Sequence, residues 1–179
     1  DLSHTFYGCN AIGSLEALRN WNTSNLANMQ ETFWHCPAIQ SLEPLSGWTD
    51  LSHLTNLKQT FRECPSIRSL EGLNTPAWNN APKTNLEGTF REMSSLSDIS
   101  ALSDWNISQT TNLSATFFGD CTIGDVNALA GWGDDLTGIT SLAQLFRNCS
   151  SLRNIEGLRN WDVSGITSMN ETFCDCPYL

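Results

Sequence analysis

The chain has few basic residues. Nine Lys and Arg stand against 19 Asp and Glu, which gives a formal net charge of −10. Nucleic acids and anionic membrane surfaces both require clustered cations to neutralise phosphate groups. Long hydrophobic runs are also missing, and a membrane-spanning helix needs about 20 mostly apolar residues in a row. We therefore expect no nucleic-acid partner and no membrane insertion within these 179 residues.

The sequence also lacks the short motifs of catalysis and cofactor binding. It contains no Gly-x-Ser-x-Gly elbow, Walker loop, His-Glu-x-x-His pair or EF-hand loop. Its three histidines, His4, His35 and His53, do not have the spacing of a metal site. We expect no enzymatic activity, no cofactor and no catalytic residue. The acidic charge is compatible with a cationic partner or Ca²⁺, and equally with plain solubility.

What the chain does contain is a repeat, marked by one phenylalanine in each copy. Successive members are 27, 28, 29, 27, 29 and 27 residues apart. A fixed period of this length is typical of stacked repeats, where each unit is too small to bury its own apolar stripe. The seven positions are Phe6, Phe33, Phe61, Phe90, Phe117, Phe146 and Phe173.

The segments on either side of each phenylalanine predict different elements. Upstream, apolar residues with i, i+3, i+7 spacing indicate a short helix, preceded by an Asn or Ser that suits a helix N-cap. Downstream, apolar residues recur at every third position, and the best strand candidates lie there. These candidates are residues 14–16, 41–43, 69–71, 98–100, 125–127 and 154–156. Stacking would align them as a parallel sheet with about 4.8 Å between repeats. The third repeat carries an insertion near Thr75-Pro76, which we expect in a surface loop.

Cysteine and tryptophan also follow the repeat. Cys9, Cys36, Cys64, Cys149 and Cys176 share one position, with Met93 in the same position and Cys121 shifted by one residue. Free cysteine packs as a small buried hydrophobe, so we expect buried thiols, although neighbouring repeats lie within disulfide reach. Tryptophans in a repeating apolar register are expected in the core or at its boundary. They are Trp21, Trp48, Trp78, Trp105, Trp132 and Trp161.

Few residues remain as binding candidates once these positions are assigned to packing. Two polar positions in each strand candidate should face outward, and like charges stacked there would repel each other unless they bind something. The alternative is that nearby arginines relieve the repulsion. Trp34 lies outside the tryptophan register and is a second candidate for a partner contact. Tyr7, Trp34 and Phe118 each directly follow a repeat phenylalanine and favour contacts on the side of the predicted helices. The acidic candidates are Glu16, Glu43, Glu71, Asp98, Asp125 and Glu156.

Two sequence segments resemble a known family. Residues 20–29, Asn-Trp-Asn-Thr-Ser-Asn-Leu-Ala-Asn-Met, and residues 160–169, Asn-Trp-Asp-Val-Ser-Gly-Ile-Thr-Ser-Met, are similar to the BspA-like leucine-rich-repeat surface proteins of bacteria. The recurring Phe-x-x-Cys-x-x-Leu pattern carries the same resemblance. It implies a secreted or surface-anchored protein, often adhesive, with no catalytic residues to transfer.

The repeat and the resemblance together predict one domain over residues 1–179. We expect an α/β solenoid of about six stacked repeats, a leucine-rich-repeat-like right-handed coil with a parallel sheet on one face and short helices on the other. Both ends fall within a repeat, so we expect an excised piece of a longer chain. The predicted function is an extracellular, cell-surface binding module that recognises a host or neighbouring-cell protein or glycan. The alternative is a structural spacer or assembly unit that self-associates through its ends.

Overall fold

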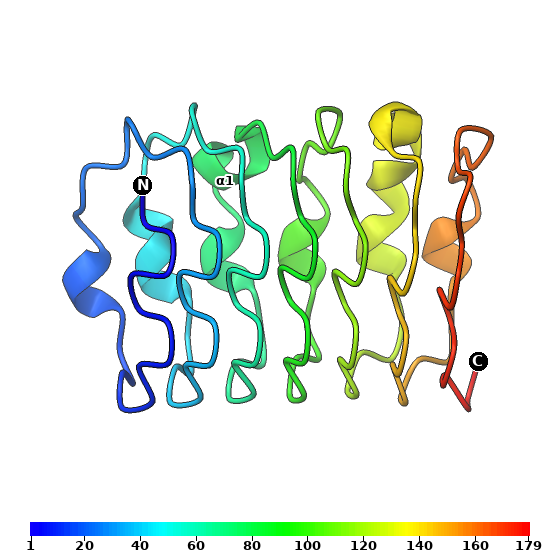
Figure 1. Cartoon of the computed structure of the whole chain (residues 1–179), viewed down its shortest axis with the longest axis horizontal. Helices are drawn as coiled ribbons and strands as arrows, with labels where there is room; N and C mark the ends of the chain where they lie inside the picture. The colour runs from blue at the N-terminus through cyan, green and yellow to red at the C-terminus, as the bar shows by residue number, and fades with distance from the viewer.

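The computed structural model describes all residues from Asp1 to Leu179, and it is a row of stacked repeats (Figure 1). We number the repeats 1 to 7 by their phenylalanines. The segments around these phenylalanines form the face toward the viewer in Figure 1, here called the front face. The short helices form the opposite face, here called the back face.

The secondary structure consists of one short α-helix and six 3-10 helices, most of them a single turn. The 3-10 helices are η1 (Glu16–Leu18), η2 (Glu43–Gly47), η3 (Glu71–Leu73), η4 (Ser100–Leu102), η5 (Asn127–Gly138) and η6 (Glu156–Leu158), and the α-helix is α1 (Pro76–Asn80). No β-strand forms, and six isolated parallel bridges are the nearest approach to a sheet. The predicted α/β solenoid with a parallel sheet is therefore wrong.

The helices and strands predicted on either side of each phenylalanine are also wrong in position. Each segment predicted as a strand ends at the first residue of a 3-10 helix; these residues are Glu16, Glu43, Glu71, Ser100, Asn127 and Glu156. The segments predicted as helices form consecutive turns, and four of the six parallel bridges lie at their start. One such bridge joins Asn28 to Asn56.

Left-handed residues explain why the front segments form neither helix nor strand. Two residues in every repeat, at positions −2 and +2 from the phenylalanine, have φ between 53° and 77°. In repeat 2 these are Glu31 and His35, with φ of 56° and 58°. Right-handed helices and strands both need negative φ at every residue. The backbone of each front segment therefore changes direction at these residues. Only three of the 14 left-handed residues in the chain are glycines, namely Gly8, Gly88 and Gly119.

This change of direction sends every second backbone N–H toward the next repeat. The N–H groups of Met29, Glu31, Phe33 and His35 each donate to repeat 3 at 2.9 Å, to the carbonyls of Asn56, Lys58, Thr60 and Arg62. The remaining N–H groups close turns inside the segment, as when Thr32 donates to Met29. Backbone hydrogen bonds therefore link the repeats along the front without a regular sheet.

The core consists of the columns that the repeat predicts. Neighbouring phenylalanine rings stack with centroids 5.3 to 6.0 Å apart. Five tryptophans are buried and donate their indole N–H to a leucine carbonyl of the preceding repeat, as Trp48 does to Leu18 at 2.8 Å. Cys36, Cys64 and Cys149 are buried free thiols. The prediction of packed tryptophans and thiols is confirmed at these positions.

A threonine column completes the core, and the sequence analysis did not identify it. The residue before the phenylalanine is a buried threonine in repeats 2 to 5 and in repeat 7. Each hydroxyl lies within hydrogen-bond distance of two carbonyls, one in its own repeat and one in the preceding repeat. Thr89 contacts the carbonyls of Leu86 and Leu57 at 2.8 and 2.9 Å. Leu145 holds the position in repeat 6.

The insertion of repeat 3 forms α1 and buries a lysine. Lys83 is 1% exposed, and its ammonium donates to the carbonyls of Trp78, Asn79 and Ala81 at 2.8, 3.1 and 2.9 Å. It also lies 4.8 Å from the centre of the Trp105 ring. Burial lowers the pKa of Lys83 to about 7, while the carbonyls and the indole favour the charged form.

Candidate functional site

The predicted acidic candidates lie on the back face, at or just before the 3-10 helices. Glu16, Glu43, Glu71 and Glu156 are the first residues of η1, η2, η3 and η6. Asp98 and Asp125 each lie two residues before a helix, and their Oδ1 atoms accept the N–H of Ser100 and Asn127 at 2.9 and 3.0 Å. The same position holds Ser14, Ser41, Ser69 and Asn154, which accept the equivalent N–H groups.

Arg19 relieves the repulsion between the first two members of the acidic row. Its guanidinium hydrogen-bonds both oxygens of Glu16, at 2.6 and 3.0 Å, and contacts both oxygens of Glu43. The hydrogen bonds from Arg19 hold the pKa values of Glu16 and Glu43 below their usual range. Arg159 pairs with Glu156 in the same way at 2.8 Å. The back-face acids are thus largely engaged in turns and ion pairs.

An open, mostly polar hollow separates repeats 4 and 5 on the back face. Asp98 and Asp125 lie in its lining together with Ser97, Ser100 and Asn127. No group of three or more His, Cys, Asp or Glu side chains in the chain is arranged to hold a metal ion. Binding of Ca²⁺ by the acidic candidates stays a prediction.

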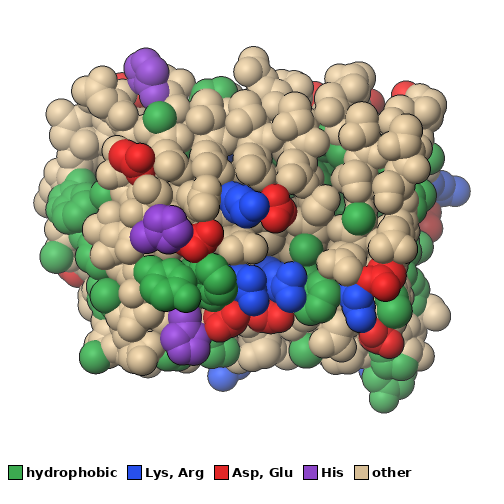
Figure 2. All heavy atoms as spheres, viewed as in Figure 1, with side chains coloured by type: hydrophobic (Ala, Val, Ile, Leu, Met, Phe, Trp, Pro, Cys, Tyr) green, Lys and Arg blue, Asp and Glu red, His purple; other side chains and the backbone are tan.

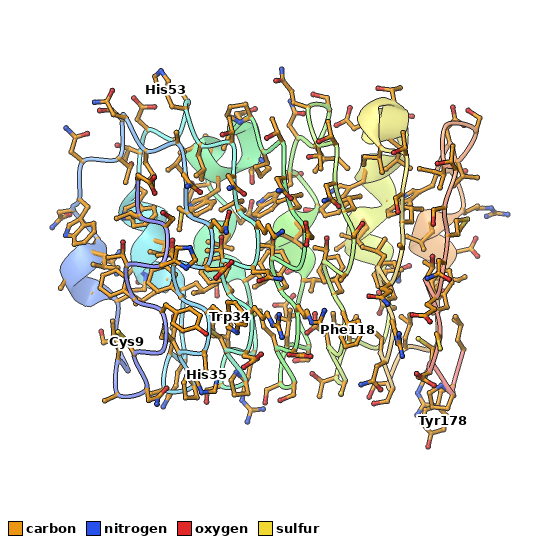
Figure 3. All side chains as sticks on the ribbon, viewed as in Figure 1. Cys9, Trp34, His35, His53, Phe118 and Tyr178 are labelled. Atoms are coloured by element: carbon orange, nitrogen blue, oxygen red, sulfur yellow. The ribbon has the colours of Figure 1, made fainter.

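Trp34, the remaining candidate, belongs to a row of side chains across the front face. The row occupies the position directly after the phenylalanine in repeats 1 to 6. Figure 2 shows it as a row of hydrophobic and basic side chains below the middle of the face, and Figure 3 labels Trp34 and Phe118 within it. Its members are Tyr7, Trp34, Arg62, Arg91, Phe118 and Arg147. We call this set the aromatic–arginine row.

Members of the aromatic–arginine row contact one another across the repeats. Tyr7 meets Trp34 edge to face, with ring centroids 5.0 Å apart. The guanidinium of Arg62 lies 4.4 Å from the centre of the Trp34 ring. Phe118 lies between two guanidinium groups, those of Arg91 at 4.0 Å and Arg147 at 5.6 Å. These contacts hold long side chains in fixed positions at a partly exposed surface.

Acidic neighbours neutralise the cations of the row. Arg62 is 3.1 Å from Glu63 and 3.5 Å from Glu92. Glu92 also pairs with Arg91 at 3.2 Å, and Glu171 pairs with Arg147. Burial raises the pKa of Glu63, but hydrogen bonds from His35 and Trp34 outweigh this effect, so its pKa lies below the usual range. The aromatic–arginine row therefore presents flat rings and guanidinium groups, and neighbouring carboxylates pair with its arginines.

The sequence analysis found only the aromatic half of this row. It noted that Tyr7, Trp34 and Phe118 follow the repeat phenylalanine, and it overlooked that arginines hold the same position in three other repeats. Reading that position through all repeats would have found Arg62, Arg91 and Arg147. Their proximity to the aromatic rings required the structure.

Comparison with known proteins assigns the family. The sequence matches the family described as "Mycoplasma protein of unknown function, DUF285" over residues 1–132 and again over residues 116–179. The chain belongs to this family. The two matches together cover all 179 residues. No curated protein matches the chain.

This assignment corrects the resemblance drawn from the sequence. The DUF285 match names no leucine-rich-repeat family, so the identification as a BspA-like leucine-rich-repeat protein is wrong. The leucine-rich-repeat description of the fold is corrected with it, because the structure lacks the parallel sheet. The cell-surface location and adhesive role stay predictions. No helix of the chain has the length and apolarity needed to cross a membrane.

Proposed function

We propose that this chain is a non-catalytic binding module whose aromatic–arginine row recognises a partner protein. The single observation that carries the proposal is the composition and order of that row. Trp, Tyr and Arg are the residues that most often dominate the binding energy of protein interfaces. Here they lie with Phe118 in one row across six repeats. Contacts between rings and guanidinium groups hold each neighbouring pair except Arg62 and Arg91, which Glu92 bridges.

Pre-formed contacts favour binding because they reduce the ordering that association requires. Immobilising a flexible side chain at an interface costs about 0.5 to 1.5 kcal/mol. Arg62 and Arg91 are already held by rings and carboxylates, with 19% and 24% of their side chains exposed. The row therefore presents rigid planar groups rather than mobile cations.

The geometry favours a protein over a glycan. A sugar ring stacks on the free, flat face of an aromatic side chain. The Trp34 ring has the Arg62 guanidinium over it and Tyr7 at its side, and Phe118 lies near two guanidinium groups. A protein partner contacts the edges of rings and the planes of guanidinium groups together, as interface cores do.

The test compares two aromatic residues that have the same kind of neighbour. Trp34 lies under Arg62 in the row, and Tyr178 lies under Arg153 at 4.5 Å, outside the row. The wild type, Trp34→Ala and Tyr178→Ala are immobilised, and the proteins that each retains from an extract are identified. The affinity of a purified candidate is then measured by calorimetry.

We expect Trp34→Ala to weaken binding about 30-fold or more, as for a hot-spot residue, and Tyr178→Ala to bind like the wild type. Circular dichroism checks that each variant is folded. Equal binding by both variants would disprove the proposal. A spacer would retain no protein that depends on Trp34.

A further inference from the structure

The thiol column of the core contains one acidic residue. The position three residues after the phenylalanine holds cysteine in repeats 1, 2, 3, 6 and 7 and Met93 in repeat 4. Figure 3 labels Cys9, the first member of the column. In repeat 5 the position belongs to Asp120, which is fully buried, and Cys121 is displaced to the next residue. An aspartate thus replaces a small hydrophobe.

In repeats 2, 3, 6 and 7 the cysteine of the column makes the same hydrogen bond. The thiol donates to the carbonyl of the phenylalanine in the preceding repeat. Cys36 donates to Phe6 at 3.0 Å, and Cys149 donates to Phe117 at 3.1 Å. Cys64 and Cys176 make the same contact. The equivalent acceptor for repeat 5 is the carbonyl of Phe90.

Only one of the two carboxyl oxygens of Asp120 has a hydrogen-bond partner. Its Oδ1 accepts the N–H of Met93 at 2.8 Å. Its Oδ2 is buried without any hydrogen-bond partner, and no donor reaches the carbonyl of Phe90. A proton on Oδ2 would make Asp120 a donor, as the thiols are elsewhere in the column. A buried carboxylate without a partner is far more costly than a buried carboxylic acid.

The surroundings offer no cation to the carboxylate. Met93 and Glu92 face it from repeat 4, and Cys149 faces it from repeat 6. Burial raises the pKa of Asp120 well above its ordinary value, and the charge of Glu92 acts in the same direction. Burial, with Asp120 as the next contributor, also raises the pKa of Cys149. Arg62 and Arg91 are engaged with Glu92 itself.

We propose that Asp120 is a pH-sensitive point of the core, which keeps its proton in the folded protein and loosens the contact between repeats 4 and 5 when it ionises. The same two repeats are separated on the back face by the hollow that Asp98 and Asp125 line. No parallel bridge joins Asp98 to Asp125, whereas Ser69–Asp98 and Asp125–Asn154 are bridged. On the back face, the junction that carries the buried acid therefore lacks the bridge that joins repeats 3 and 4 and repeats 5 and 6.

The direction of the pH effect follows from proton counting. An aspartate in the unfolded chain loses its proton near pH 4. Between that pH and the higher pKa of the folded state, only the folded protein holds the proton. Raising the pH in this window therefore favours the unfolded chain, so stability falls. Above the folded pKa the loss is complete and stays constant.

The experiment measures unfolding midpoints of the wild type, Asp120→Asn and Asp120→Cys between pH 5 and pH 8. Asn keeps the shape and adds a donor, and Cys restores the residue of the column. Asp125→Asn is the matched control, because Asp125 is exposed and lies only five residues away. Amide exchange at Met93 and at the front-face amides of repeat 4 reports on the junction itself.

We expect both Asp120 variants to melt several degrees above the wild type at pH 8, with a smaller difference at pH 5. About 3 °C corresponds to 1 kcal/mol for a domain of this size. The Met93 amide should exchange faster in the wild type than in Asp120→Asn as the pH rises, after correction for intrinsic exchange. A difference that does not change with pH, or one that Asp125→Asn reproduces, would overturn the proposal.

Discussion

The front and back faces of this molecule are built from the same repeats, yet they hold the repeats together in different ways. On the front, alternate backbone N–H groups bridge successive repeats, as from Phe33 to Thr60 at 2.9 Å. On the back, short 3-10 helices pack side by side, and five tryptophan indoles donate to carbonyls of the preceding repeat. On the front, backbone hydrogen bonds hold neighbouring repeats together, and on the back, close side-by-side packing does so.

The two faces also use their charged side chains differently. On the front, arginines lie among aromatic rings and carboxylates, which gives a surface suited to a partner. On the back, the acidic side chains begin helices or close turns, as Asp98 does for Ser100. A row of acids therefore does not by itself mark a binding site, because the local backbone can use the carboxylates first.

The strongest test of the close packing on the back is at Gly72. A Cβ added there would lie 2.0 Å from the carbonyl oxygen of Leu42, which is backbone and cannot move aside. We expect Gly72→Ala to lower the free energy of unfolding by about 3 kcal/mol, measured by urea denaturation. Gly124→Ala is the control, because nothing lies within 4 Å of its added Cβ. Equal effects would show that the back face is not closely packed.

A second prediction concerns the insertion of repeat 3, where the buried charge of Lys83 should limit stability. Lys83 has a folded pKa of about 7, whereas its ordinary value is 10.5. Between these values the unfolded chain binds one more proton, so stability should rise with pH by about 1.4 kcal/mol per unit.

Replacing Lys83 by Met should remove this slope, so the difference in stability between the wild type and the variant should itself change with pH. Unfolding is measured from pH 6 to pH 10, with Lys58→Met as the control. Lys58 is a partly exposed lysine paired with Glu87 at 3.1 Å. Parallel stability curves for the wild type and Lys83→Met would contradict the expectation.

The smallest expected effect concerns the threonine column of the front. Thr89→Val keeps the shape but removes a hydroxyl that lies 2.8 and 2.9 Å from two carbonyls. We expect a loss of about 1 kcal/mol in the free energy of unfolding. Thr5→Val should change little, because Thr5 is exposed in repeat 1. A neutral Thr89→Val would mean that the column contributes shape rather than hydrogen bonds, as Leu145 does in repeat 6.

The sequence analysis was right about burial and wrong about backbone conformation. Periodicity placed Phe61, Trp48 and Cys64 in the core, and all three are buried. The same periodicity assigned helices to the front and strands to the back. The assignment of helices to the front failed because residues such as Glu31 and Gln59 adopt a left-handed conformation, which their residue types do not predict. Such a conformation costs about 1 to 2 kcal/mol per residue, so local preference argues against it.

Of the candidate site, the sequence identified Trp34 but not its neighbours in space. It also nominated Glu16 and Glu43, whose shared ion pair with Arg19 depends on two repeats lying side by side. Contacts between residues 24 to 29 positions apart cannot be read from local pattern alone. They follow only when the register of stacking is known.

The sequence by itself determined which side chains are buried, because apolar surface must leave water and the repeat places it at regular intervals. The tertiary structure decided the path of the backbone. Each front segment gives up helix and strand geometry because its alternate N–H groups then find carbonyls on the next repeat, and buried backbone groups must be paired. The same stacking placed arginines against aromatic rings, and it left Asp120 in a column of thiols.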